Sequence, residues 1–170
     1  MNTVKQYLEA FLELGESAFL EKYNHPFLLY PGKHGHGGFR SYHTQMADRT
    51  QGANLAGSGK PLRDFMVLSP ASSAKGKVPN KLLVGRSDDK DLSIDHSTVS
   101  KRHAFIIKDE SGSYKLGDAG STNGTFLNGQ RVETGEPVFI KDGNILSFGD
   151  CDYLYYSPRG FIDILARIGS

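Results

Sequence analysis

The sequence contains no tryptophan, a single cysteine and no long hydrophobic run, and the last two shortages each argue against a class of protein. Cys151 alone cannot form an internal disulfide, which favours a reducing compartment. No apolar stretch approaches the ~18 residues that a membrane span needs, and the N-terminal residues soon include Glu9 and Glu13. We therefore expect a cytoplasmic protein that has no membrane partner.

Neither sign of charge is in excess. The chain has 20 Lys+Arg and 19 Asp+Glu, a formal net charge of +1, whereas a general nucleic-acid binder carries a clear basic surplus. Hydrophobic residues make up 38% of the 170 positions, enough for a core without a disulfide or a structural metal. The composition predicts a folded protein that does not bind nucleic acid, and it leaves a single well-placed anion as a candidate ligand.

The first 63 residues divide into a helical part and a part poor in large hydrophobic residues. Thr3 and Gln6 have the spacing of a capping box that begins a helix. The apolar residues that follow at helical spacing are Val4, Leu8, Phe11 and Leu12. Residues 27–30 favour a short buried strand, and glycines then recur up to residue 59. We predict a helical N-terminal appendage at 1–30 and a Gly-rich linker or long loop at 31–63.

After residue 63, short β-type runs alternate with turn residues, a texture typical of a β-sandwich or barrel. The expected strands are 65–69, 81–85, 92–94, 103–109, 113–116, 125–127, 130–132, 138–140, 144–148 and 153–157. Asn128-Gly129 predicts a tight hairpin turn, because both residues readily take positive φ angles. Ser157 and Pro158 can begin a last helix. We predict an all-β sandwich at 64–158 and a C-terminal helix at 159–170.

Three polar clusters lie where expected strands become loops, at residues 85–87, 97–103 and 120–125. Loops separated by an odd number of antiparallel strands can gather at one end of a sandwich, so we expect the three clusters to share one concave site. They offer a guanidinium, an ammonium, hydroxyls and an amide, with no obvious pairing of a nucleophile with a base. This set of donors is suited to hold a phosphate group.

Four motifs in a fixed order resemble the forkhead-associated (FHA) domain over roughly residues 64–158. They are Gly85-Arg86, Ser100-Lys101-Arg102-His103-Ala104, Ser121-Thr122-Asn123-Gly124-Thr125 with Asn128-Gly129, and residues 142–149. The resemblance implies a β-sandwich of about eleven strands that binds phosphothreonine peptides through the loops at one end. It implies a non-enzymatic adaptor of Ser/Thr kinase signalling, with no cofactor, whose partner is a phosphothreonine protein such as a kinase or its substrate.

The resemblance also implies a role for individual residues. The implied phosphopeptide contacts are Arg86, Ser100, Lys101, Thr122 and Asn123, of which Asn123 binds the peptide main chain. The implied supports of the binding loops are Gly85, His103, Gly124 and Asn128. Lys101 stands where the family often has arginine, so a point charge replaces a planar fork. Thr98 lies where the family often reads the side chain three places beyond the phosphothreonine.

Simpler explanations exist for several of these residues. Arg86 taken alone fits a salt bridge with a nearby carboxylate, and the hydroxyls of Ser100 and Thr122 fit turn caps. The acidic run at Asp88, Asp89, Asp91 and Asp95 is interpreted as a solvated face rather than a calcium loop. His34, His36 and His43 lie in the glycine-rich tract, which favours a solvated segment over a metal site.

Two other functions stay open at this stage. An FHA-fold assembly or scaffolding module would bind an unphosphorylated protein partner, for example through the apolar helical face in residues 1–30. An enzyme would use the FHA unit as a regulatory part. The first 63 residues hold no assembled catalytic set, so the enzyme is the less favoured of the two.

Overall fold

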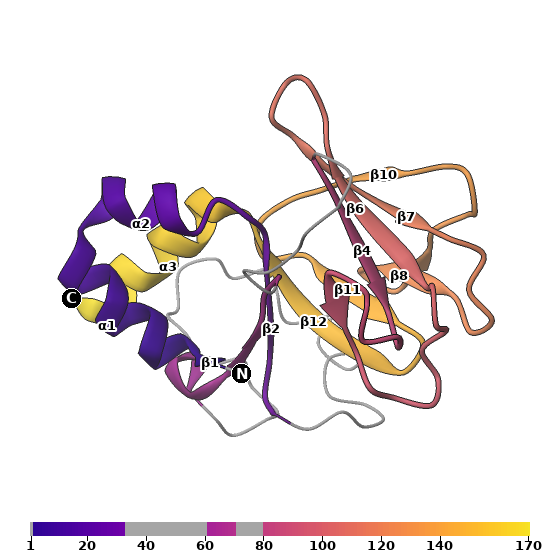
Figure 1. Cartoon of the computed structure of the whole chain (residues 1–170), viewed down its shortest axis with the longest axis horizontal. Helices are drawn as coiled ribbons and strands as arrows, with labels where there is room; N and C mark the ends of the chain where they lie inside the picture. The colour runs from indigo at the N-terminus through magenta and orange to yellow at the C-terminus, as the bar shows by residue number, and fades with distance from the viewer. Residues whose placement is uncertain (1, 33–60, 71–79) are drawn as a thin grey trace.

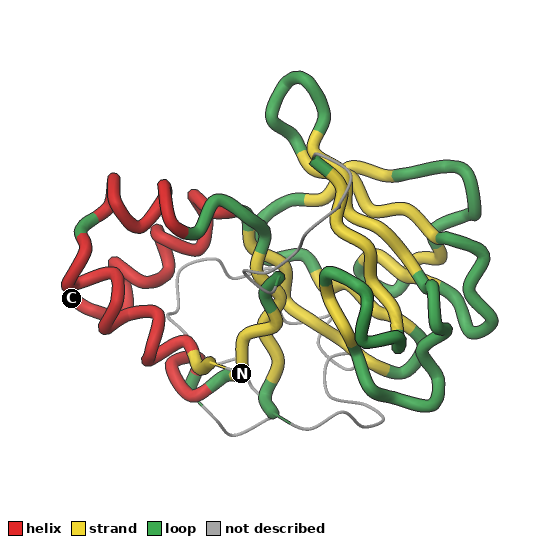
Figure 2. The backbone as a smooth tube through the Cα atoms, in the orientation of Figure 1, coloured by secondary structure: helices red, strands yellow, loops and turns green. Residues whose placement is uncertain are grey.

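The computed structural model describes residues 2–32, 61–70 and 80–170, which form three layers. A layer of helices covers one face of a seven-stranded sheet, and a five-stranded sheet packs on the other face (Figure 1). The helical layer contains α1 (Val4–Leu14), α2 (Glu16–Lys22) and α3 (Pro158–Gly169), and a short 3-10 turn, η2 (Leu62–Asp64), adjoins it. Helices from the two ends of the chain therefore lie side by side (Figure 2).

The two sheets account for all named strands of the described residues. The seven-stranded sheet has the order β1 (Asn2–Thr3), β3 (Met66–Leu68), β2 (Phe27–Tyr30), β12 (Cys151–Tyr156), β11 (Ile145–Phe148), β8 (Thr125–Leu127) and β9 (Gln130–Arg131). The five-stranded sheet has the order β10 (Val138–Ile140), β7 (Tyr114–Asp118), β6 (Ala104–Lys108), β4 (Lys81–Gly85) and β5 (Leu92–Ser93). Neighbouring strands are antiparallel except β4 and β5, which are parallel. The predicted β-sandwich is confirmed.

The helix ends follow local signals that the sequence already carries. The Thr3 hydroxyl oxygen accepts a hydrogen bond from the Gln6 N–H, and the Gln6 Oε1 accepts one from the Thr3 N–H, so the capping box is formed. Ser157 caps α3 by accepting from the Gly160 N–H, with Pro158 in the first turn. These contacts satisfy backbone donors that a helix N-terminus leaves unpaired.

Strand β2 explains why the helices belong to the same folding unit as the sheets. Its side chains alternate: Phe27 and Leu29 face the helices, whereas Leu28 and Tyr30 face the five-stranded sheet. All four are buried, which accounts for an uninterrupted apolar run where a surface strand would alternate with polar residues. β2 is hydrogen-bonded between β3 and β12. The boundaries expected at residues 30 and 64 therefore cut through a continuous sheet, and the 1–30 segment is structurally part of the sandwich.

Three further expectations concern the linker, a membrane span and the single cysteine. Residues 33–60 of the expected linker, with His34, His36 and His43, lie outside the described residues. None of the described helices is long and apolar enough to cross a membrane. Cys151 is buried in β12, and burial, with lesser effects of Asp150 and Asp152, raises the pKa of its thiol to about 12.

We expect the helices and the sheets to unfold in one transition. Phe161 of α3 is fully buried, and its ring stacks on that of Phe27 at 4.1 Å between centroids. Phe161→Ala should lower the free energy of unfolding by about 3–5 kcal/mol, because it leaves a cavity between the layers. Urea unfolding followed by circular dichroism measures this change.

Leu12→Ala is the matched control, since the Leu12 side chain is 66% exposed, and it should shift the free energy of unfolding by less than about 0.5 kcal/mol. If the helices of Phe161→Ala unfolded at lower urea while the sheets unfolded as before, the helices and sheets would not form a single folding unit.

Candidate functional site

Ser100 is the residue where the three predicted polar clusters meet. The Arg86 N–H donates to the Ser100 carbonyl at 2.9 Å, which joins the end of β4 to the 97–103 loop. The Thr122 N–H donates to the Ser100 Oγ at 3.1 Å, and the two hydroxyl oxygens lie 3.5 Å apart. Thr122 is exposed and Ser100 half-buried. The structure thus brings Arg86, Ser100 and Thr122 together at one end of the sandwich.

Arg86 lies beside Ser100 with its charge available to solvent. Its Nε donates to the Val99 carbonyl at 3.1 Å, so part of the guanidinium is fixed while the side chain remains exposed. Within the described residues, no carboxylate forms an ion pair with it, and Asp91 instead accepts from the Leu83 N–H at 2.7 Å. The salt-bridge explanation of Arg86 therefore finds no support among these residues.

Gly85 permits the close approach of β4 to the 97–103 loop. A Cβ at this position would overlap the Lys101 carbonyl, whose carbon would lie 2.9 Å away. The side chain of Lys101 is exposed, while its carbonyl accepts from the Ser87 N–H at 3.4 Å. Any larger residue at 85 would push Arg86 and Ser100 apart.

His103 connects the 97–103 loop to the 120–125 loop through two hydrogen bonds. Its Nδ1 accepts from the Ser100 N–H at 3.0 Å, so its Nε2 carries the proton and donates to the Gly124 carbonyl at 2.9 Å. The ring is completely buried, and burial, opposed by the bond to Gly124 and by Asp118, lowers the pKa of His103. The neutral form with its proton on Nε2 is therefore the one that fits both partners.

Asp118 organises the loop that carries Thr122 and Asn123. Its carboxylate accepts five hydrogen bonds, from the N–H groups of Gly120 and Ser121 and from the hydroxyls of Ser121, Thr125 and Thr134. Burial acts to raise the pKa of Asp118, but these bonds outweigh it and bring the pKa to about 2. Sequence reasoning missed this residue. The available signal was an aspartate followed two and three places later by glycine and serine, the pattern of an Asx turn.

Asn123 and Thr98 tie the same loop to the 97–103 loop. The Asn123 Nδ2 donates to the Thr98 carbonyl at 2.9 Å, while the Asn123 side chain stays exposed. The Thr98 hydroxyl lies 2.9 Å from the His96 Nδ1 and accepts from the Asp150 N–H at 3.0 Å. Thr98 thus has bonds within the protein, where the resemblance implied a contact to a peptide side chain.

The remaining predicted supports lie at the base of the loops. Gly124 has a φ of 91°, a value that favours glycine, and its N–H donates to the Ser121 hydroxyl at 3.0 Å. Asn128 has a φ of 48° in the turn between β8 and β9, and its Oδ1 accepts from the Ile145 N–H at 2.8 Å. The predicted hairpin turn is confirmed.

One expectation about the acidic run is wrong. Asp91 is only 5% exposed, because its carboxylate turns inward to the Leu83 N–H. Asp89 forms an ion pair with Lys90 at 2.7 Å. The run is therefore partly structural rather than one solvated face.

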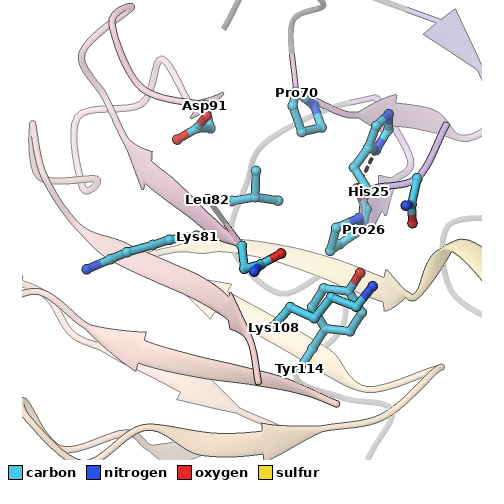
Figure 3. A pocket seen from close by; sticks show the side chains of 10 residues that line it. His25, Pro26, Pro70, Lys81, Leu82, Asp91, Lys108 and Tyr114 are labelled. Carbon is cyan, nitrogen blue, oxygen red and sulfur yellow. Dashed lines mark hydrogen bonds between the residues drawn. The ribbon is translucent and has the colours of Figure 1, made fainter. Parts of the chain in front are cut away.

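The structure also contains a cavity of about 250 Å³ (Figure 3). It is lined by residues that include His25, Lys81, Lys108 and Tyr114. Lys81 and Lys108 stand at the ends of β4 and β6 opposite to Gly85 and His103. The cavity and the polar loops are thus at opposite ends of the sandwich.

The arrangement at the loops suits binding rather than bond cleavage. Both nitrogens of His103 are occupied by backbone groups, so this imidazole cannot accept a proton from the Ser100 hydroxyl. Among the described residues, no group of three His, Cys, Asp or Glu side chains is placed to hold a metal ion. The exposed groups are cations, hydroxyls and an amide, which are donors to an anion.

Comparison with known proteins identifies the family of this region. The family model of the FHA domain matches residues 82–149, which include the meeting point of the loops. This stretch of the chain is an FHA domain, and FHA domains are binding modules rather than a catalytic family.

Individual relatives are similar to part of this chain and to part of their own length. The chain is 42% identical over 70 residues to the glycogen accumulation regulator GarA of Mycolicibacterium smegmatis, covering 41% of this chain and 37% of GarA. It is 29% identical over 106 residues to the ABC transporter ATP-binding/permease protein Rv1747 of Mycobacterium tuberculosis, covering 62% of this chain and 11% of the transporter. The chain thus spans well under half of the length of these curated relatives.

A solved structure of the N-terminal FHA domain of Rad53 from Saccharomyces cerevisiae, in complex with a phosphothreonine peptide, is also similar. Its sequence identity is 26% and its TM-score is 0.46, over 58% of this chain and 88% of that chain.

The hydrogen bonds to Asp118 predict a large stability contribution from its charge. A pKa of about 2, against about 3.9 in an unfolded chain, corresponds to roughly 2–3 kcal/mol. Asp118→Asn should lower the free energy of unfolding by at least that amount at neutral pH, measured by urea unfolding. Asp109→Asn, in an exposed turn, is the control and should change stability far less. Equal effects of the two variants would contradict a special role for Asp118.

The neutral state of His103 predicts a pH dependence of folding. Because its pKa is lowered in the folded protein, its contribution is complete above the unfolded value of about 6.5 and is lost as the pH falls below that value. We expect the free energy of unfolding to decrease between about pH 7.5 and pH 5. The pKa of His25 is also lowered by burial, so it contributes in the same direction.

The variants His103→Asn and His25→Asn separate the two contributions. Each should remove part of the slope of stability against pH, and only His103→Asn should shift the amide resonances of Ser100 and Gly124. An unchanged slope in the His103 variant would contradict a lowered pKa of this imidazole in the folded protein.

Proposed function

We propose that this chain is an adaptor that binds phosphothreonine in partner proteins of Ser/Thr kinase signalling. The phosphate would lie against Arg86, Ser100, Lys101 and Thr122, and Asn123 would hold the peptide main chain. The single observation that carries the proposal is the meeting of the Arg86, Ser100 and Thr122 loops, residues that are distant in sequence.

The chemistry of these groups matches a phosphate dianion. Phosphothreonine carries a charge of about −1.5 to −2 and three acceptor oxygens. Arg86 and Lys101 supply exposed positive charge, and Ser100 and Thr122 supply hydroxyl donors held on fixed loops. Removing the phosphate would leave these donors without their acceptor, so the unphosphorylated peptide should bind much more weakly.

The relatives support a module that is shared among proteins of different activity. GarA is named as a regulator and Rv1747 as a transporter, and each resembles this chain over only part of its own length. A region common to such different proteins is better explained by recognition of a partner than by one chemical reaction. We therefore propose that the chain itself is not an enzyme and needs no cofactor. We also propose that it acts in the cytoplasm, where it would meet the substrates of Ser/Thr kinases.

The alternative, an assembly module for an unphosphorylated partner, is less well supported. It relied on the apolar face of the first helix, but Val4 of this face is fully buried and Leu8 and Phe11 pack against the same core. Only Leu12 of that face is largely exposed. The face is thus used mainly to attach α1 to the sheet.

Arg86→Ala tests the proposed function. The variant should weaken binding of phosphothreonine peptides by roughly tenfold or more, since a hydrogen bond to a charged group contributes about 1.5–3 kcal/mol. Isothermal titration calorimetry with a phosphothreonine peptide library and its unphosphorylated counterpart measures this. Arg86→Lys should bind with intermediate affinity, because it keeps the charge and loses the fork.

The matched control is Arg63→Ala, which removes an exposed arginine from η2 in the helical layer and should leave affinity unchanged. Equal affinity for phosphorylated and unphosphorylated peptides, or normal binding by Arg86→Ala, would refute the proposal.

A further inference from the structure

The outer face of the five-stranded sheet differs from that of the seven-stranded sheet. The helices cover the outer face of the seven-stranded sheet, whereas β10, β7, β6 and β4 lie on the side away from them (Figure 1). No described helix or strand packs on their outward side chains. Within residues 2–32, 61–70 and 80–170, this face therefore has no cover.

Strand pairing places seven residues on this face in two rows. The inward residues of these strands belong to the core between the sheets, so the alternating residues point outward. One row consists of Lys81, Ile107, Lys115 and Phe139, and the next of Leu83, Phe105 and Gly117. Neighbouring strands are ~4.8 Å apart, so the first row is about 14 Å long. We call these seven residues the cation–aromatic face.

Both lysines of this face are held over aromatic rings. The Lys81 Nζ lies 4.5 Å from the centre of the Phe105 ring, and the Lys115 Nζ lies 4.4 Å from that of Phe139. Phe139 is 58% exposed, so its ring contributes apolar surface to this face. The Phe105 ring fills the space above Gly117, where a Cβ would overlap it. The rings thus fix both the apolar surface and the position of the two ammonium groups.

The charge of the cation–aromatic face has one sign. Its rows contain two lysines and no carboxylate. Asp109, at the end of β6, has a pKa that is lowered first by the Ser111 hydroxyl and only to a lesser extent by Lys115. Within the described residues, neither lysine forms an ion pair with a carboxylate.

We propose that the cation–aromatic face is a second docking surface, for an acidic segment of a protein partner. Carboxylates would pair with Lys81 and Lys115, and apolar side chains of the segment would cover Ile107 and Phe139. Nucleic acid is disfavoured because an ammonium group already occupies one side of each ring, where a base would stack. The surface does not depend on phosphate binding. Its residue Leu83 is nevertheless only two positions before Gly85 in β4, next to the proposed phosphate site.

Nuclear magnetic resonance titration of the full chain with a short polyglutamate peptide tests the proposal. We expect saturable shifts of the Phe105, Ile107, Lys115 and Phe139 amides that weaken as salt is raised. The double variant Lys81→Glu/Lys115→Glu should weaken binding by roughly tenfold or more, and Phe139→Ser should weaken it to a smaller degree. Lys5→Glu makes the same kind of charge change at an exposed site on α1 and should have no effect.

Several outcomes would overturn the proposal. Shifts confined to the Arg86 and Ser100 loops would mean that polyglutamate only mimics phosphate at the proposed site. Tighter binding of a single-stranded oligonucleotide at the same amides would assign the face to nucleic acid, and concentration-dependent self-association abolished by Phe139→Ser would assign it to a second copy of the chain. Phosphothreonine binding should stay normal in all these variants, which separates this test from that of Arg86→Ala.

Discussion

The buried imidazole of His103 is the contact on which the proposed binding end depends. It accepts a hydrogen bond from the Ser100 N–H and donates one to the Gly124 carbonyl, so a single neutral ring sets the separation of two loops. Hydrogen bonds are strong in such a desolvated place, and an unpaired group is costly there. The exposed donors above it, Arg86 and Thr122, can stay exposed because their backbones are fixed from below.

The second constraint is that β2 is buried on both of its faces. Phe27 and Leu29 need a cover as much as Leu28 and Tyr30 do, and the helices from the two ends of the chain provide it. The helical layer is therefore a structural need of the seven-stranded sheet rather than an attachment to a finished domain. The five-stranded sheet has no such cover in the described residues, and it leaves Phe139 exposed and Phe105, Lys81 and Lys115 half-buried.

The polar loops and the cation–aromatic face of the sandwich offer different chemistry. The polar loops present donors for an anion, while the cation–aromatic face combines positive charge with apolar area. A partner segment that reached both would gain affinity from two moderate contacts, because the second binding step would be intramolecular. Such a partner would need an acidic stretch near its phosphothreonine.

Several elements could be predicted from the sequence because local chemistry specifies them. The capping box at Thr3, the turn at Asn128 and the strands 81–85, 125–127 and 138–140 match the structure, because hydrogen bonds and backbone preferences within a few residues decide them. The meeting of the Arg86, Ser100 and Thr122 loops was expected from the position of the polar clusters between antiparallel strands, and the family resemblance then assigned their roles.

Tertiary structure alone decided the rest, because long-range contacts carry no local sequence signal. A four-residue apolar run does not say which strands it joins, so the place of β2 between β3 and β12 was not foreseen. Asp118 and Asp91 look like surface carboxylates until the fold surrounds them with backbone and hydroxyl donors. Burial changes the preferred partners of a charged group, and burial is a property of the whole fold.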